Sequence, residues 1–332
     1  MPQLVVTIGD PTGIGPEVLA KALAGSMPPG EILVIGDAAV WAEAQRLSGA
    51  QLPPIAADRP GPPTRGGIPF LDVPPADRSW TVGRMSAAAG RAAAEWLEHA
   101  VRLAIQGAAD AVVFAPLNKQ AIIRAGFRVS DEYEFVASLA GVGAHDEVNV
   151  IPHPAGPAGG SDLLWVARVT SHLPLSGVAA SLTIEQVQRA IRLAHRTTAA
   201  AGAASPRIGV AAFNPHAGEG GLLGDEETRV IGPAIQAALH EGINASGPHP
   251  ADHIFRLARA GHFDAIVAMY HDQAQIATKL LGFDRGVSVG VGYSFVLATP
   301  SHGTAFDIAG RGIADPGPMQ QALALAARLA RR

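Results

Sequence analysis

The chain contains no cysteine among its 332 residues. That absence excludes disulfide bonds, thiolate nucleophiles and zinc sites built on cysteine, and it fits a reducing compartment. Charge is sparse and nearly balanced, because 16% of the residues are charged and the net charge is −4. Since the sequence shows no basic stripe and no charged tail, we expect no nucleic-acid partner.

Long hydrophobic runs are also missing. Every apolar run is shorter than the roughly 20 residues that a membrane-spanning helix needs. The opening stretch, MPQLVVTIGDPTGIG, lacks the charged region and the long apolar region of a secretion signal. We therefore expect a soluble, cytoplasmic protein that does not associate with membranes.

Short apolar runs, by contrast, are abundant and alternate with helical patterns. The length allows roughly two domains or one large α/β unit. Strands are expected at residues 3–8, 31–36, 110–115, 147–151, 163–169, 207–213, 264–269 and 286–291. Helices are expected at residues 86–109, 183–202 and 225–242, the second opening with a possible capping box of Thr183 and Gln186. This alternation predicts an α/β protein with a largely parallel sheet.

The sequence indicates the domain organisation only in part. Residues 51–80 are rich in proline and glycine, which indicates an extended arm or a linker. No internal repeat marks a boundary. We expect one two-lobed unit over residues 1–332, in which one lobe is discontinuous and holds both termini and the other covers roughly 130–300.

Three histidines share the same sequence context. His172 follows the apolar run LLWVARV, His216 follows RIGVAAF, and His271 follows DAIVAM. Ligands collect at the carboxyl ends of strands in α/β sheets, so three imidazoles from different strands could meet at one divalent cation. The alternative is that they are independent turn residues. Asp252 and Asp272 are the nearest carboxylates for such a site, although Asp272 could equally cap a helix.

Two glycine-rich segments suggest a cofactor site. GDPTGIGPE, at residues 9–17, follows the first strand but is neither a complete dinucleotide fingerprint nor a phosphate-binding Walker loop. HGTAFDIAGRG, at residues 302–312, is expected to open a helix, whose free N–H groups would favour an anion or a nucleotide. Each signal is weak alone, and a tight structural turn explains the first equally well.

Taken in order, the segments GDPTGIGPE, APLNK, VTSHLPL, NPHAGEGG, GPHPAD, YHDQ and HGTAFDIAG resemble the 4-hydroxythreonine-4-phosphate dehydrogenase family of pyridoxal phosphate biosynthesis. The first and last are also similar to the wider isocitrate and isopropylmalate dehydrogenase group. The resemblance implies a two-lobed α/β subunit with the active site in a cleft between the lobes. It also implies a homodimer.

The resemblance further implies which residues bind the metal and the cofactor. A divalent metal would be held by His172, His216 and His271, with one histidine donated across the dimer. Zinc suits imidazole ligands, and cobalt, nickel, manganese and magnesium are alternatives. NAD or NADP would be held by Gly13, His302, Gly303, Thr304, Ala305 and Asp307.

The sequence departs from the family where the phosphorylated substrate is bound. The GHTE segment of the family is replaced, so that Asp131, Glu132 and Tyr133 stand where glycine, histidine and threonine are expected. Lys279 is kept, but Ser288 and Leu297 replace an asparagine and an arginine. Phosphate is bound by cationic or N–H donors. These replacements therefore predict an unphosphorylated substrate that contacts Glu132, Tyr133, Lys279, Ser288 and Leu297.

Terephthalate dihydrodiol dehydrogenases, which are related to this family, also have a tyrosine in the region of Tyr133. We accordingly expect a metal-dependent, decarboxylating NAD(P) dehydrogenase that oxidises an unphosphorylated β-hydroxy acid, such as a carboxylated cis-dihydrodiol. Lys279 and Asp252 are the expected catalytic residues, and Lys119 is a weaker candidate. The main alternative is a 4-hydroxythreonine-4-phosphate dehydrogenase. An acyl-phosphate transferase and a non-catalytic binding protein fit less well, since neither needs the three histidines.

Overall fold

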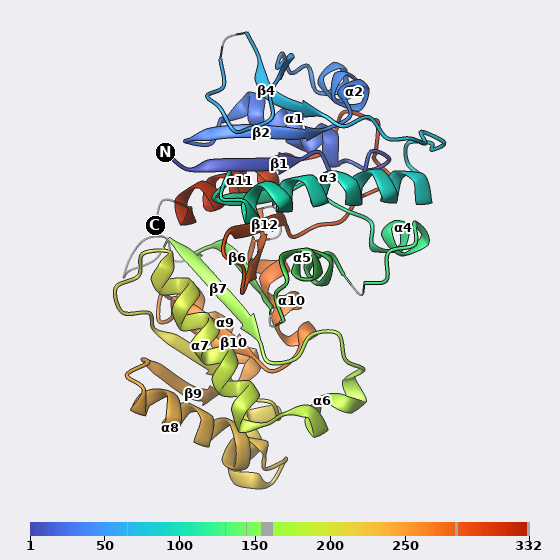
Figure 1. The fold of residues 1–332 in the computed structure, drawn as a ribbon. Coiled ribbons are helices and arrows are strands. Elements are labelled where there is room, and N and C mark those ends of the chain that lie inside the picture. The colour runs from blue at the N-terminus through green and yellow to red at the C-terminus, as the bar shows by residue number, and fades with distance from the viewer. Residues whose placement is uncertain (65, 130, 144, 154–161, 283–284, 331–332) are drawn as a thin grey trace. The chain divides into compact units, whose positions relative to one another are not determined.

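The chain forms two compact units in the computed structural model (Figure 1). Met1–Glu147 and Val287–Arg332 make up the first, and Val148–Gly286 makes up the second. The described residues are 1–64, 66–129, 131–143, 145–153, 162–282 and 285–330. The first unit is discontinuous and contains both termini, and the inserted unit is shorter than the expected range of 130–300.

The first unit is built on a mostly parallel sheet. Its strands are β1 (Gln3–Thr7), β2 (Glu31–Gly36), β3 (Pro54–Ala56), β4 (Ile68–Asp72), β5 (Ala111–Phe114), β11 (Val287–Val291) and β12 (Val296–Pro300). Their order across the sheet is β3-β4-β2-β1-β5-β12-β11, and only the β11–β12 pairing, among those described within this unit, is antiparallel. β1 and β5 are buried apart from Gln3, as strands covered on both faces require.

Helices cover both faces of this sheet. They are α1 (Gly15–Gly25), α2 (Ala38–Ser48), α3 (Ala87–Ile105), α4 (Lys119–Arg124), α5 (Glu132–Ala140) and α11 (Gly317–Leu329). α3 lies in front of the sheet in Figure 1 and contacts β1, β2 and β5, whereas α11 lies behind it and contacts β5 and β12. Side-chain caps begin several of these helices, because Asn118 accepts a hydrogen bond from Ala121 N and Asp131 accepts one from Glu134 N.

The second unit is also built from strands flanked by helices. Its strands are β6 (Asp146–Pro152), β7 (Leu163–Arg168), β8 (Ile208–Ala211), β9 (Ala245–His249) and β10 (Ala265–Ala268), in the order β6-β7-β10-β8-β9. Its helices are α6 (Leu175–Ser181), α7 (Ile184–Ala200), η1 (Pro215–Gly221), η2 (Glu227–Ile231), α8 (Gly232–His240), α9 (Ala251–Arg259) and α10 (His271–Gly282). β7, β10, β8 and β9 are parallel, and β6 is antiparallel to β7.

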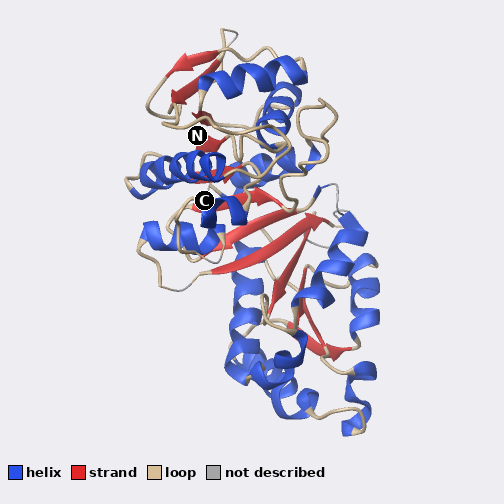
Figure 2. Ribbon diagram, turned by 90° about the vertical axis from the view of Figure 1, so that its right-hand side faces the viewer, coloured by secondary structure: helices blue, strands red, loops and turns tan. Residues whose placement is uncertain are grey.

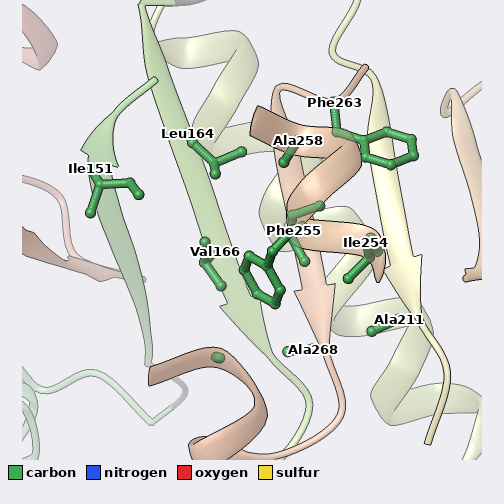
Figure 3. Packing of buried hydrophobic residues seen from close by; sticks show 11 residues of the cluster. Ile151, Leu164, Val166, Ala211, Ile254, Phe255, Ala258, Phe263 and Ala268 are labelled. Carbon is green, nitrogen blue, oxygen red and sulfur yellow. The ribbon is translucent and has the colours of Figure 1, made fainter. Parts of the chain in front are cut away.

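The core of the second unit lies between this sheet and the helices α9 and α10. Figure 3 shows Phe255 of α9 beside Val166 of β7, and Ile254 of α9 on the side of Ala211 of β8. α7 contacts β7, β8 and β10, and α8 packs beside α7, so helices flank the strands as Figure 2 shows for each unit. Burial of this apolar surface fixes the strand ends that carry His172 and His271.

Each strand predicted from the sequence coincides with an observed strand to within about two residues, which confirms the α/β interpretation. Four observed strands were not predicted: β3, β4, β9 and β12. β3 and β4 lie in the proline-rich segment 51–80, which was expected to be an arm or a linker and instead extends the first sheet at its edge. Proline is tolerated at sheet edges, because an edge strand leaves some backbone N–H groups unpaired.

Two local predictions were wrong in part. Residues 305–312 form turns, whereas a helix was expected there, and the next helix begins at Gly317. Positive φ values of 75° at Gly310 and 69° at Gly312 interrupt any helix in that segment. The capping box forms only by half: Thr183 Oγ1 accepts a hydrogen bond from Gln186 N, but Gln186 Oε1 makes none. No helix in the described part of the chain is long and apolar enough to cross a membrane.

Candidate functional site

His172 and His271 come together at the carboxyl ends of two neighbouring parallel strands. β7 and β10 are paired up to Arg168 and Ala268, and the backbone pairing continues as Thr170 N donates to Met269 O at 3.1 Å. The two imidazole ring centroids lie 6.1 Å apart. Small side-chain rotations would therefore bring both rings onto one cation, given metal–nitrogen bonds of about 2.1 Å.

The two histidines line a surface pocket of about 210 Å³. The other lining residues are Ser171, Leu173, Leu175, Val178, Tyr270 and Asp272. Asp272 Oδ1 lies 2.7 Å from His271 Nδ1, so the carboxylate orients the ring and leaves Nε2 as the candidate ligand atom. Asp272 belongs to the first turn of α10, which begins at His271, so it acts on the histidine and is not the residue that precedes the helix.

Gln273 anchors the turn that carries His271. Its Oε1 accepts a hydrogen bond from Met269 N at 2.7 Å, and its Nε2 donates one to Ala212 O at 2.8 Å. The side chain thus ties the end of β10 to the end of β8. Sequence reasoning missed this role, although the YHDQ segment containing Gln273 was noticed.

His216 is presented by a different kind of backbone. Residues 216–220 all have positive φ, from 44° at Glu219 to 76° at Gly218, so η1 contains one left-handed turn. Three of these residues, His216, Ala217 and Glu219, are not glycine. The left-handed conformation costs non-glycine residues roughly 1–2 kcal/mol each, so the surroundings must hold this turn in place.

Glu227, on η2, is the buried acid beside this turn. Its Oε1 accepts hydrogen bonds from Phe213 N at 2.8 Å and Asn214 N at 2.7 Å, and its Oε2 accepts one from Asn214 Nδ2 at 3.0 Å. Burial alone would raise the pKa of Glu227, but these hydrogen bonds outweigh it and hold the pKa below its usual value. The carboxylate therefore stays ionised. The sequence showed Glu227 only as an acid at a helix start.

One chain by itself does not gather the three histidines. Among the residues that the structure describes, no three histidine or acidic side chains are positioned to hold a metal ion. His172 and His271 share a pocket, whereas His216 is exposed on its own turn. Asp252 is exposed in the first turn of α9 and does not line that pocket. Its role as a catalytic carboxylate stays a prediction.

In the first unit, the two glycine-rich segments lie against each other. Ile14 N donates to Thr304 O at 2.9 Å, and a Cβ added to Gly13 would lie 2.7 Å from the Thr304 Cβ. Gly13 is therefore required by close packing against the HGTAFDIAG segment. His302, Ala305 and Gly303 continue this segment, and Ala305 has a positive φ of 41°. Asp307 is exposed, and burial lowers the pKa of His302.

Glu17 fixes the end of the same segment. Its buried carboxylate accepts hydrogen bonds from Gly312 N and Ala314 N, and Lys21 Nζ donates to the carbonyls of both residues. A pocket of about 260 Å³ lies beside these loops, lined by Gly13, Glu17, Gly310, Val40, Trp80 and Val82 among others. An apolar pocket with adjacent backbone N–H groups can hold a planar ring with a polar tail.

Glu132 and Tyr133 begin α5. Lys119 Nζ lies 3.5 Å from Glu132 Oε2, and burial raises the pKa of Glu132. Tyr133 is buried, and its ring lies edge-on to Phe114 at 6.4 Å between centroids. The charge of Glu132 is thus partly balanced by Lys119. The Asp131 carboxylate caps α5 and so points toward its own helix.

The remaining predicted substrate residues lie in different surroundings. Leu297 is fully buried in β12, and Ser288 of β11 is 6% exposed and lies within hydrogen-bonding distance of Ser301 Oγ. Lys279 is exposed in the last turn of α10. The structure places Leu297 in the hydrophobic core, so its role in substrate binding, like that of Ser288 and Lys279, stays a prediction.

The family is decided by a family model. The model described as pyridoxal phosphate biosynthetic protein PdxA matches residues 30–326. The chain belongs to the PdxA family. A Beijerinckia indica protein named 4-hydroxythreonine-4-phosphate dehydrogenase is 41% identical, covering 98% of this chain and 94% of its own length. A D-threonate 4-phosphate dehydrogenase of Cupriavidus necator is 40% identical, covering 100% of this chain and 98% of its own.

Solved structures that resemble this chain include a 4-hydroxythreonine-4-phosphate dehydrogenase and a dihydrodiol dehydrogenase. A 4-hydroxythreonine-4-phosphate dehydrogenase from Klebsiella pneumoniae has a TM-score of 0.84 at 35% identity, covering 100% of this chain and 98% of its own. A terephthalate 1,2-cis-dihydrodiol dehydrogenase from Burkholderia xenovorans has a TM-score of 0.65 at 31% identity, covering 98% of this chain and 97% of its own.

These comparisons overturn the substrate expected from the sequence. The PdxA-family relatives with the higher identities are named for phosphorylated substrates, so the interpretation as a decarboxylating dihydrodiol dehydrogenase was wrong. The physical reason lies in the replaced GHTE segment. The residue types there predicted two carboxylates that would repel phosphate, but Asp131 caps α5 and Glu132 lies beside Lys119.

Proposed function

We propose that this PdxA-family chain is an NAD(P)-dependent dehydrogenase that oxidises the secondary alcohol of a small 4-phosphorylated hydroxy acid. The proposal rests above all on the similarity of about 40%, over nearly the full length, to relatives named for 4-hydroxythreonine 4-phosphate and D-threonate 4-phosphate. Both names describe an acid with a hydroxyl group and a terminal phosphate. Release of carbon dioxide is not part of this proposal.

His172, His216 and His271 are the proposed ligands of a divalent cation. The pairing of His172 with His271, and the orientation of His271 by Asp272, support this role. Three neutral imidazoles suit zinc and leave a coordination position for substrate oxygen. A bound cation would polarise the substrate alcohol and stabilise the alkoxide.

The third ligand is proposed to come from a second copy of the chain. Four leucines beside His172 and His216 are exposed in the isolated chain: Leu173, Leu175, Leu222 and Leu223, at 42% to 79%. Exposed apolar residues of this size indicate a surface that is covered in the assembly. A homodimer would cover them and bring His216 of one copy to His172 and His271 of the other.

The loops around Gly13 and Thr304 are the proposed cofactor site, together with His302, Gly303, Ala305 and Asp307. The pocket of about 260 Å³ beside Gly13 and Gly310 has the apolar lining that the adenine ring of NAD or NADP needs. A bound nicotinamide would accept the hydride. Lys279 is the proposed partner of a substrate anion, and Asp252 is a proposed carboxylate near the metal.

The experiment is a turnover assay that follows the absorbance of the reduced cofactor with purified, zinc-supplemented protein. The substrates are 4-hydroxythreonine 4-phosphate, D-threonate 4-phosphate and the dephosphorylated form of each, with NAD and with NADP. We expect turnover of at least one phosphorylated acid and little turnover of its dephosphorylated partner. Equal turnover of both forms would contradict the proposal, and so would the absence of any turnover.

A further inference from the structure

We infer that Glu227 is a positioning residue, whose buried carboxylate holds the left-handed turn that presents His216 to a divalent cation. The inference rests on the proposed function for the identity of that ligand. Glu227 is 6% exposed and accepts three hydrogen bonds from Phe213 and Asn214, the two residues that precede Pro215 and His216.

The turn needs such a restraint. Its five consecutive left-handed residues include His216, Ala217 and Glu219, which do not favour this conformation. Its own hydrogen bonds lie at its far end, where Leu222 N reaches Glu219 O at 3.4 Å and Leu223 N reaches Gly218 O at 3.1 Å. At the near end the backbone N–H groups of Phe213 and Asn214 bond to Glu227. The direction in which the chain enters the turn is therefore set by this carboxylate.

The turn is also shaped around the carboxylate. A Cβ added to Gly218 would lie 2.7 Å from Glu227 Oε2 and 2.9 Å from Gly224 O. Glycine at this position lets the turn close onto Glu227, so the acid and the turn fit one another on two sides. A side chain that is fixed in this way transmits its position to His216 through only two peptide units.

Glu226 provides a matched control on the same element. It accepts a hydrogen bond from Asn214 Nδ2 at 2.6 Å, and no hydrogen bond from a backbone N–H to its side chain is described. Removing its charge therefore alters the local electrostatics and one side-chain contact but leaves the two backbone hydrogen bonds of the turn intact.

The experiment uses the full-length protein and the variants Glu227→Ala, Glu227→Gln, Glu226→Gln and His216→Ala. Zinc affinity is measured by titration calorimetry without substrate, and hydrogen–deuterium exchange is measured over residues 213–221. We expect Glu227→Ala to lower zinc affinity about 10- to 100-fold, as for other residues that orient metal ligands. It should also speed exchange at Phe213 and Asn214.

The conservative variants sharpen the test. Glu227→Gln keeps one acceptor oxygen for the two backbone amides but places an amide N–H against Asn214 Nδ2, so its zinc affinity should lie between those of the wild type and Glu227→Ala. Glu226→Gln should stay within about threefold of the wild type. If Glu227→Ala does not fold, the comparison of Glu227→Gln with Glu226→Gln decides the question.

Three outcomes overturn the inference in distinguishable ways. If Phe213 and Asn214 exchange hydrogen for deuterium in Glu227→Ala at the same rate as in the wild type, the carboxylate does not hold the turn. Faster exchange with unchanged zinc affinity would show that the turn does not position a ligand. If His216→Ala binds zinc as the wild type does, the proposed metal site itself is wrong. If His216→Ala loses zinc binding while the Glu227 variants keep it, only the positioning role of Glu227 is wrong.

Discussion

The second unit presents its candidate ligands in two contrasting ways. His172 and His271 follow adjacent parallel strands, and their positions are set by the regular pairing of β7 with β10. His216 instead lies on five left-handed residues that follow β8. The first arrangement uses geometry that any parallel sheet provides, whereas the second uses a strained backbone held by one acid.

The contrast teaches that ligands of one proposed site can differ in how easily they are disturbed. Regular strand ends are supported by many backbone hydrogen bonds and by the core shown in Figure 3. A strained turn persists only while its specific contacts remain. Single substitutions should therefore displace His216 more readily than they displace His172 and His271.

The largest effect is expected from removing an imidazole on either side of this comparison. His271→Ala and His216→Ala should each lower kcat/KM by about a hundredfold or more, because a bound cation contributes several kcal/mol to stabilising the alkoxide. Steady-state kinetics with the best phosphorylated substrate would measure this. His240→Ala, at the exposed end of α8, is the control and should leave the rate unchanged. A large loss for only one of the two ligands would separate the two regions in function.

A second prediction concerns two glycines with similar positive φ angles. Gly218 and Gly242 have φ values of 76° and 79°, but only Gly218 would place a Cβ against another group, at 2.7 Å from Glu227 Oε2. Gly242→Ala should cost about 1 kcal/mol in unfolding free energy from backbone strain alone, and Gly218→Ala about 2–3 kcal/mol. Denaturant unfolding measures both. Equal costs would mean that the turn does not press against Glu227.

The regular side of the comparison should respond less. Gln273→Ala leaves Met269 N and Ala212 O without their side-chain partner, so we expect a loss of about 1–2 kcal/mol in unfolding free energy. Zinc affinity should fall less than in Glu227→Ala, since strand pairing still places His271. The same calorimetric titration checks this, and a larger fall than in Glu227→Ala would reverse the comparison.

The smallest effect is expected from pH. Because the folded pKa of Glu227 is held below its ordinary value of 4.5, its stabilising contribution is present above that value and is lost as the pH falls through the folded pKa. The difference in unfolding free energy between the wild type and Glu227→Gln should therefore be constant near neutrality and shrink in acid. Unfolding curves recorded at several pH values would show this, and a difference that grows in acid would mean that the pKa is raised.

Much of the fold was predictable because its strands are buried on both faces. Runs such as LVV and AIVA are apolar throughout and indicate buried segments. β9 and β3 escaped prediction because both contain proline and lie at sheet edges, where exposure weakens the apolar signal. The turns at 305–312 escaped because the positive φ values of Gly310 and Gly312 leave no mark in the pattern of residue types.

The candidate site was predictable only as a set of residues. The position after a strand selected His172, His216 and His271, and the family resemblance placed Gly13 and the HGTAFDIAG segment together among the expected cofactor-binding residues. The supporting residues Glu227, Gln273 and Glu17 were not singled out, because acids and amides near helix starts are common and their hydrogen-bond partners are distant in sequence. The substrate prediction was wrong because the residue types at 131–133 do not show that Asp131 caps its own helix.

The sequence by itself determined the elements and the chemistry available to this protein. Apolar periodicity and local propensity act over a few residues, so they can be read along the chain. Tertiary structure alone decided that His172 lies beside His271, that Glu227 holds the turn of His216, and that Glu132 lies beside Lys119. These facts depend on which strands become neighbours and on which polar groups are buried together, and both follow from packing the whole unit rather than from any local segment.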